Sequence, residues 1–273
     1  MDNNLTSVSD WDSTWCDFTP SLIKENDRIL GRNGAFIKTL EKRWELHAND
    51  NVLELGGACS AYLCSLAKYK KINASVIDYS QLGLTKTKEL FNLNGCEVDL
   101  YSGDLLSYAF SEKSFECIVH WGLIEHFKDP TEIFQISSRI LKESGAVVFT
   151  MPNMEAYGVN LWKKYDTEDY ETHIFHSDEY IRKLAKDSGL KVHSIYHWGP
   201  PLYFNAGFWF KDQLFLKSIV NLFVRFLGII NRVLPLFNYG HRKISAHRAF
   251  TVSYTHLRAH ETPEHLVCRL LLE

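Results

Sequence analysis

The sequence predicts an α/β fold, a doubly wound and mostly parallel seven-stranded sheet with helices on both faces. Short apolar runs alternate along the chain with segments of helical periodicity, which is the pattern of βαβ units. The first apolar run, residues 52–55, ends in the glycine pair Gly56-Gly57 before a helix begins. Of the 273 residues, 45% are hydrophobic, which is enough for one sizeable core.

The elements can be taken in order. Residues 1–48 are expected to form a helical cap, with a loosely ordered arm or lid over residues 1–19 and helices over 20–30 and 33–47. Residues 49–152 are expected to form the ligand-binding core. The expected strands cover residues 52–55, 74–78, 97–101, 115–120, 145–150, 190–196 and 249–252, and the later helices cover 61–69, 80–94, 131–141 and 177–188.

Acidic residues follow three neighbouring strands. Glu54, Asp78 and Asp104 stand at or just after strand ends, where parallel sheets bind ligands. The glycine turn offers free backbone N–H groups at a helix start, which suits a phosphate or a carboxylate. Asp78 lies 22 residues after Gly56, where it can accept the hydroxyls of a ribose. The pattern predicts a nucleoside ligand with an anionic tail, either a dinucleotide or S-adenosylmethionine.

Two residues favour S-adenosylmethionine. Ala58 occupies the second glycine position of the dinucleotide fingerprint G-x-G-x-x-G, where its methyl group would hinder a pyrophosphate. Glu54 would repel a pyrophosphate, but it can accept hydrogen bonds from an ammonium group. An NAD(P)-dependent oxidoreductase and a non-catalytic nucleoside-binding protein remain the alternative hypotheses.

Five segments carry a family resemblance. They are residues 52–58, 76–80, 103–105, 115–119 together with 125–127, and 141–146. In order and spacing they resemble the class I S-adenosylmethionine-dependent methyltransferases of the small-molecule type that includes the ubiquinone-biosynthesis methyltransferases. The resemblance implies a Rossmann-like fold and S-adenosylmethionine as methyl donor. The family's Glu-x-Gly-x-Gly-x-Gly motif is incomplete, because Ala58 and Ser60 replace its later glycines.

The resemblance also implies which residues surround the cofactor. From the methionine part through the ribose and adenine to the methyl group, they are Glu54, Gly56, Gly57 and Ala58, then Asp78 and Tyr79, then Asp104 and Leu105, and finally His120, Trp121 and Gly122. Asp104 has the alternative role of capping the backbone that follows it.

Histidines are the candidate general bases. Methyl transfer depends mainly on orientation, and a base adds to the rate when the acceptor is a hydroxyl. His126 and His173 are ranked equally, His176 is a further candidate, and a purely structural role for His126 stays open. The sequence shows no cysteine or carboxylate partners for these histidines, so no metal site is expected.

Residues 153–250 are expected to form the acceptor side. Residues 153–176 contain four large aromatic residues and predict either an aromatic lid or a surface flap. Residues 208–236 predict an amphipathic helix with a basic stripe. Three basic residues make a membrane span unfavourable. Contact with a membrane surface, or burial against the sheet or in a homodimer, are the two interpretations.

The expected acceptor is therefore a small molecule or, if the helix docks on a membrane, a lipid-linked one. A net charge of −3 gives no argument for nucleic acid. Six cysteines without a C-x-x-C pair indicate a reducing compartment, so we expect a cytoplasmic protein, peripheral to the inner face of the membrane if the helix docks there. Residues 252–273 resemble translated adaptor read-through, and we exclude their histidines and cysteine from the site.

Overall fold

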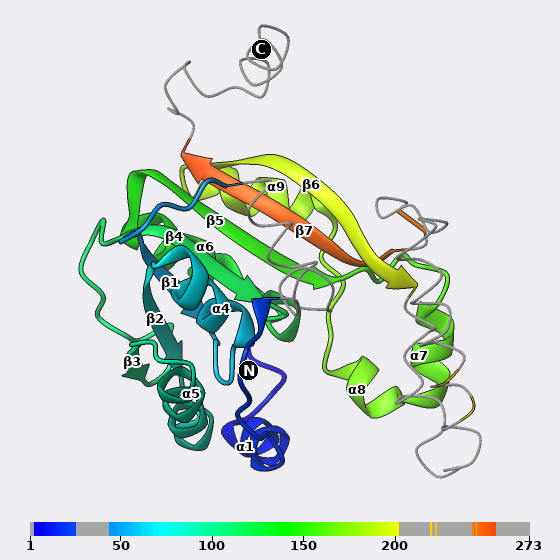
Figure 1. Cartoon of the computed structure of the whole chain (residues 1–273). Helices are drawn as coiled ribbons and strands as arrows, with labels where there is room; N and C mark the ends of the chain where they lie inside the picture. Colours follow the sequence, from blue (N-terminus) through cyan, green and yellow to red (C-terminus); the bar gives the residue numbers. More distant parts are fainter. Residues whose placement is uncertain are drawn as a thin grey trace, which may run out of the picture.

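Seven strands form one sheet in the order β3-β2-β1-β4-β5-β7-β6 (Figure 1). The computed structural model describes residues 3–25, 44–201, 219, 222, 242–243 and 245–254. Strands β3, β2, β1, β4 and β5 are parallel, whereas β7 runs antiparallel between β5 and β6. The predicted fold class is confirmed.

The observed elements follow the predicted order. The strands are β1 (Asn51–Leu55), β2 (Asn73–Asp78), β3 (Asp99–Ser102), β4 (Phe115–Trp121), β5 (Leu141–Pro152), β6 (Leu190–Pro201) and β7 (Ser245–Tyr254). The helices are α1 (Val8–Cys16), α4 (Ala61–Lys70), α5 (Gln81–Leu93), the 3-10 helix η1 (Ile124–His126), α6 (Thr131–Ile140), α7 (Val159–Tyr165), α8 (Thr167–Glu171) and α9 (Asp178–Asp187). The last three strands are longer than the sequence indicated.

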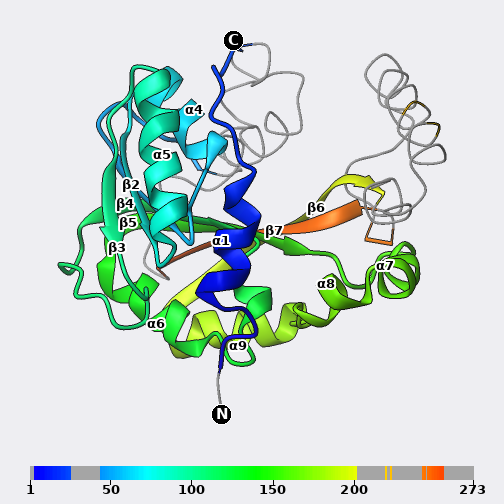
Figure 2. The same cartoon turned by 90° about the horizontal axis from the view of Figure 1, so that it is seen from below.

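Helices cover both faces of the sheet. Helices α4 and α5 lie on one face, and α6 and α9 lie on the other (Figure 2). The alternation of side chains along β4 serves both layers. Cys117 and Val119 are buried with residues of α4 and α5, while Ile118 is buried with residues of α6 and α9. The sheet therefore has two apolar layers, and its polar strand ends stay at the edge.

Serine caps fix the turns that lead from strands into helices. The hydroxyls of Ser60, Ser80 and Ser177 each accept a hydrogen bond from the backbone N–H three residues further on. Gly95 follows α5 with a φ of 66°, a conformation that glycine adopts without strain. Two of these caps, at Ser60 and Ser80, stand directly beside the strand ends of β1 and β2.

The N-terminal cap differs from the prediction. The expectation of a loosely ordered arm is wrong for residues 8–16, which form helix α1 beside α5 (Figure 1). Ser7 and Asp10 make a reciprocal capping box, which satisfies the free N–H groups at the helix start. The aromatic residues of this segment drew attention away from the serine and aspartate that begin the helix.

Two predicted helices lie largely outside the described residues. In the first of them, residues 20–24 are not helical and Glu25 is; in the second, the described residues 44–47 are not helical. For the first segment the reason is visible at Ile23, whose N–H donates to the Asn94 side chain and whose carbonyl accepts from Lys68. These tertiary hydrogen bonds hold the backbone against α4 and α5 in place of helical ones.

The C-terminal predictions are also only partly covered. Of residues 208–236, Ile219 and Leu222 are described, and both are helical and exposed. Residues 255–273 lie outside the described part, but β7 continues through Tyr254 with Val252 and Ser253 buried. Among the described residues, no helix is long and apolar enough to cross a membrane.

Candidate active site

A cavity of about 1040 Å³ lies at the carboxyl ends of β1, β2 and β4. Ten predicted site residues line it: Glu54, Gly56, Ala58, Asp78, Tyr79, Asp104, Leu105, Trp121, Gly122 and His126. Gly57, His120 and His173 are not among the lining residues. The structure thus brings together most of the residues that the sequence marked, although they come from four separate strand ends.

Glu54 is a buried carboxylate in the cavity wall. Its side chain is 3% exposed, and its Oε2 has no hydrogen-bond partner among the described residues. Burial raises the pKa of Glu54 to about 8, a hydrogen bond with Ser60 opposes this rise, and the charge of Asp78 adds to it. A buried carboxylate oxygen without a donor is costly, so Glu54 is suited to receive one from a ligand.

The glycine pair shapes the backbone around Glu54. Gly56 has a φ of 61°, which turns the chain sharply after β1. Gly57 has a different role, because a Cβ at this position would lie 2.7 Å from Cγ of Glu54. The absence of a side chain at Gly57 lets the Glu54 side chain fold under the loop. Gly57 therefore shapes the site from outside the cavity lining.

Asp78 is held in position by the backbone. Its Oδ2 accepts from the N–H of Ala58 at 3.1 Å, and its Oδ1 accepts from the N–H of Ser80 at 2.8 Å. Burial raises the pKa of Asp78, and these backbone hydrogen bonds lower it. The carboxylate joins the loops after β1 and β2, and its remaining lone pairs can accept ribose hydroxyls.

The loop after β3 supplies the next part of the wall. Asp104 accepts a hydrogen bond from the N–H of Leu106 at 2.9 Å, so it stabilises a turn as well as lining the cavity. Leu105 is buried beside it and presents apolar surface. The local capping role that the sequence left open for Asp104 is thus present, and its exposed position on the cavity leaves it available to a ligand.

The end of β4 separates two neighbouring residues by side-chain direction. Trp121 and Gly122 line the cavity, whereas the His120 ring stacks on Phe149 with centroids 4.6 Å apart. Burial lowers the pKa of His120 to about 3, so the ring is neutral. Successive strand residues point to opposite faces, which explains why His120 lies in the core layer and outside the lining.

Helix α1 closes the cavity with residues that the sequence analysis did not assign to the site. Trp11 and Trp15 both line the cavity, and their rings stack with centroids 5.8 Å apart. Asp12 accepts a 2.5 Å hydrogen bond from the Ser80 hydroxyl, which ties α1 to the loop after β2. Their signal was present in the sequence, as a Ser-x-x-Asp capping box followed by tryptophans four residues apart.

His126 and His173 face each other from two segments, with ring centroids 4.6 Å apart. His126 Nδ1 lies 2.8 Å from the carbonyl of Thr172, and His173 Nδ1 lies 2.7 Å from the carbonyl of Asp169. Because a carbonyl only accepts, both Nδ1 atoms carry the proton and both Nε2 atoms keep a lone pair. Burial lowers the pKa of His126 to about 4 and also lowers that of His173.

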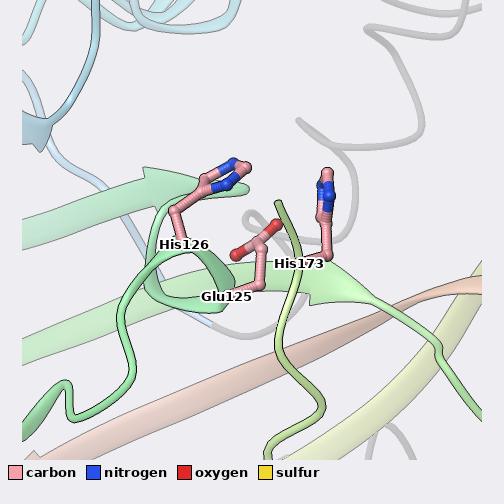
Figure 3. A group of neighbouring side chains, drawn as sticks. All are labelled: Glu125, His126 and His173. Atoms are coloured by element: carbon pink, nitrogen blue, oxygen red, sulfur yellow. The ribbon is translucent and has the colours of Figure 1, made fainter. Parts of the chain in front are cut away.

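Glu125 stands with these two histidines (Figure 3). It is 1% exposed, and burial raises its pKa to about 8. Its carbonyl accepts from the N–H of Ile174 at 2.7 Å, which docks residues 172–174 on η1. Glu125 is the carboxylate partner that the sequence analysis did not find for the histidines.

His176 has a structural environment. Its Nε2 lies 3.2 Å from the carbonyl of Ile124 and 3.0 Å from that of Phe127, so the ring braces η1. Nearby, Trp162 packs edge-on against His173, whereas Tyr157 is 69% exposed. No described residue of 153–176 lines the cavity. Trp162 therefore supports His173, and the described residues of this segment do not cover the cofactor cavity.

The cavity fits S-adenosylmethionine on the chemistry of its donors and acceptors. Glu54 offers the unpartnered Oε2 of its carboxylate for an ammonium group, and the α4 start offers backbone N–H groups for a carboxylate. Asp78 offers lone pairs to a ribose, and Tyr79 and Leu105 offer apolar surface to an adenine. All of these groups belong to the lining of the same cavity.

Comparison with known proteins supports this assignment. The model of a methyltransferase domain family matches residues 25–195, and none of the curated proteins is significantly similar in sequence. Coclaurine N-methyltransferase bound to N-methylheliamine and S-adenosylhomocysteine has a TM-score of 0.62 and 15% identity, over 93% of this chain and 84% of that one. A candidate sarcosine dimethylglycine methyltransferase from Galdieria sulphuraria has a TM-score of 0.61 and 15% identity, over 90% and 97%.

A third structure is phosphoethanolamine N-methyltransferase 2 from Haemonchus contortus in complex with S-adenosylmethionine. Its TM-score is 0.56 at 15% identity, and the match covers 84% of this chain but only 55% of that one. At this identity the structural likenesses concern the fold. The family model, in contrast, covers more than half of the sequence. The chain therefore belongs to the methyltransferase domain family and is an S-adenosylmethionine-dependent methyltransferase.

Proposed function

We propose that the enzyme methylates a small-molecule or lipid-linked acceptor, and that Glu54 and Asp78 hold the cofactor for this reaction. The observation that carries the proposal is the unpartnered Oε2 of Glu54, which lines the cavity one strand away from Asp78. Neighbouring strands lie about 4.8 Å apart, so the two carboxylates can bind adjacent parts of one small ligand. When bound, S-adenosylmethionine supplies a methyl group on a sulfonium centre.

The chain's own residues orient and shield the reacting groups. Glu54 binds the ammonium group of the amino-acid tail, and Asp78 binds the ribose hydroxyls. The first contact positions the tail and the second positions the sugar. Trp11 and Trp15 cover the cavity and exclude water from it. Trp121 and Gly122 form the wall next to His126, where the acceptor would approach. Orientation of this kind can lower a barrier by about 7–11 kcal/mol.

Binding measurements with two ligands test the role of Glu54. S-adenosylhomocysteine carries the amino-acid tail, whereas methylthioadenosine has the same nucleoside without it. A charge-assisted hydrogen bond is worth about 1.5–3 kcal/mol. Glu54→Gln should therefore lower the affinity for S-adenosylhomocysteine about 10- to 100-fold and leave the affinity for methylthioadenosine nearly unchanged. Asp78→Asn should weaken both ligands. Isothermal titration gives the affinities.

Glu143→Gln is the matched control, because this exposed carboxylate pairs with Lys113 far from the cavity. It should bind both ligands like the wild type. If Glu54→Gln lowers the affinity for both ligands equally, Glu54 does not bind the ammonium group. Failure of the wild type to bind S-adenosylhomocysteine at all would remove the proposed function.

We also propose that the histidine pair takes the acceptor's proton. His126 supports this role because it lines the cavity and keeps a lone pair on Nε2. His173 supports it because it stands beside His126 in the same tautomer. For a hydroxyl acceptor, loss of a general base should lower kcat about 10²- to 10⁴-fold. A methyl-transfer screen over extracted lipids and small metabolites would identify the acceptor, and His126→Asn and His173→Asn would then be compared on it.

A lipid-linked acceptor is the more specific form of the proposal. It is supported by the apolar and basic pattern of residues 208–236 and by the exposure of Ile219 (49%) and Leu222 (70%). A helix of this kind would place the enzyme on the inner face of the membrane, in the cytoplasm, where each basic residue adds about 1 kcal/mol on anionic lipid. The same apolar face could instead join two copies in a homodimer.

Co-sedimentation with anionic vesicles separates these two uses. Arg225→Glu should release the protein from vesicles of phosphatidylserine and phosphatidylcholine, whereas Lys191→Glu on β6 should not. Wild-type protein that stays in the supernatant but sediments as a dimer would support the homodimer and contradict the membrane proposal.

A further inference from the structure

Three metal-ligating side chains meet beside the cofactor cavity. Glu125 and His126 belong to η1, and His173 follows α8, so the group forms only in the folded chain. Each side chain offers a ligand atom, and these atoms all lie within 4.8 Å of one another. Figure 3 shows the Glu125 carboxylate between the two imidazole rings.

The hydrogen bonds prepare both rings for coordination. The Nδ1–H of His126 donates to the carbonyl of Thr172, and that of His173 donates to the carbonyl of Asp169. Metal-binding histidines typically use one ring nitrogen in this way, which fixes the tautomer and leaves the other nitrogen with a free lone pair. Helix α8 and the turn after it therefore supply the supporting contacts as well as one ligand.

The carboxylate lacks a donor. Glu125 Oε2 is buried and has no hydrogen-bond partner among the described residues. Arg248 is the nearby cation that acts on Glu125, but its two NH groups donate to Asp178 and to the carbonyl of His176, and its Nε makes no hydrogen bond to Glu125 Oε2. A buried acceptor atom of this kind calls for a partner.

We propose that Glu125, His126 and His173 bind one divalent first-row transition-metal ion, whose open positions take an oxygen of the acceptor. Two imidazoles and one carboxylate favour zinc, manganese, iron or cobalt over magnesium or calcium. His126 reaches the cavity, so an ion on its Nε2 would stand at the acceptor side of the cofactor. The ion would lower the pKa of a bound hydroxyl so that its proton passes to solvent water, and it would take the place of the histidines as general base. The inference deepens the proposed methyl transfer and rests on it.

The geometry needs only a small contraction. Ligand atoms at about 2.1 Å from a metal ion lie roughly 3.0–3.5 Å apart, compared with the present limit of 4.8 Å. The terminal carboxylate torsion of Glu125 is soft, and His173 is only partly buried, so both can move towards His126.

Metal titration of the full chain tests the proposal. Tag-free protein would be treated with a chelator and dialysed, and Co²⁺ would be added while visible absorption and binding heat are recorded. The expected result is one Co²⁺ per chain with d–d bands, displaced by Zn²⁺. Glu125→Gln and His173→Asn should each weaken Co²⁺ binding at least about tenfold.

His47→Asn is the matched control, because His47 is an exposed histidine within 4 Å of the carboxylates of Glu45 and Asp50. It should bind Co²⁺ like the wild type. The metal site is overturned if His173→Asn leaves Co²⁺ binding intact, or if the wild type shows no stoichiometric binding. The histidine pair then keeps the role of general base.

Measuring S-adenosylhomocysteine binding distinguishes a failure of the metal site from a failure of the proposed function. His173 lies outside the cavity lining, so His173→Asn should keep wild-type affinity for S-adenosylhomocysteine and show that the variant is folded. Loss of Co²⁺ binding with intact S-adenosylhomocysteine binding supports the metal site. Cofactor binding without any metal binding in the wild type would refute the metal site alone.

Discussion

At the scale of single residues, the site depends on a carboxylate that the fold buries without a complete set of partners. Glu54 has a free Oε2 in the cavity wall, and its position depends on the missing side chain at Gly57. The two residues are therefore expected to be energetically coupled, although only one of them touches the cavity. Gly57 is thus required because it lacks a side chain, whereas Gly56 is required because the backbone adopts a φ of 61° there.

Gly57→Ala tests the coupling. The new Cβ would lie 2.7 Å from Cγ of Glu54, so the substitution should lower the unfolding free energy by about 1–3 kcal/mol and weaken the binding of S-adenosylhomocysteine. In a Glu54→Gly background the same change should cost much less, because Cβ, Cγ and Cδ of Glu54, which would lie 2.8, 2.7 and 3.0 Å from the new Cβ, are all gone. Urea denaturation of the four proteins gives the interaction energy. An equal cost of Gly57→Ala in both backgrounds would show that the Glu54 side chain is not the obstacle.

Glu54 also predicts how stability changes with pH. Its folded-state pKa of about 8 lies above the ordinary value of 4.5, so the folded chain holds a proton that the unfolded chain releases in between. The unfolding free energy of the ligand-free protein should fall as pH rises from about 4.5 to about 8. The slope from one group is about 1.4 kcal/mol per pH unit at most.

The measurement is denaturation of ligand-free protein at pH 5.5 and pH 8. Glu54→Gln should lose part of this dependence, while Glu143→Gln should keep it, because the pKa of Glu143 is lowered by Lys113 and lies outside the window. Identical pH dependence of wild type and Glu54→Gln would contradict the raised pKa.

At the scale of elements, α1 completes the cavity from the far end of the sequence. Its capping box at Ser7 and Asp10 fixes where the helix begins, and the stacked Trp11 and Trp15 then face the strand ends. The link from Asp12 to Ser80 connects this helix to the same loop that holds Asp78. Order in α1 and cofactor binding should therefore support each other.

Ser7→Ala would test this support. Loss of an N-cap serine costs about 1 kcal/mol of helix stability, so the affinity for S-adenosylhomocysteine should fall by up to about fivefold while the core stays folded. Ser13→Ala, an exposed serine within the same helix, is the control and should bind like the wild type. Tryptophan fluorescence during titration reports both binding and the state of Trp11 and Trp15. Unchanged affinity in Ser7→Ala would mean that α1 does not contribute to binding.

At the scale of the whole molecule, the antiparallel part of the sheet, β7 and β6, supports the site through hydrogen bonds of Arg248 on β7. Arg248 on β7 donates to Asp178 of α9 and to the carbonyl of His176, and His176 braces η1. The C-terminal part of the sheet is thus connected to the segment that carries Glu125 and His126. The side chain of Arg248 is fully buried, and its guanidinium lies near the rings of Phe175 and Phe250.

The sequence was sufficient for the local parts of this arrangement. The strand ends at Glu54 and Asp78 were predictable because strand, turn and helix signals follow each other within a few residues. The meeting of His173 with Glu125 was not predictable, since it depends on a backbone contact between residues 125 and 174 across α6 to α8. His120 shows a further limit, because which face of β4 it occupies depends on strand register.

Replacement of Arg248 tests the whole-molecule connection. Arg248→Met removes one partner of a buried ion pair and should lower the unfolding free energy by about 3–5 kcal/mol, since Asp178 and the His176 carbonyl lose their donor. Combining it with Asp178→Asn should recover part of this loss, because the remaining charge is removed as well. Lys113→Met, which breaks an exposed pair, should change little. If urea denaturation finds Arg248→Met as stable as Lys113→Met, the site is held by α9 and η1 alone, and β7 only completes the sheet.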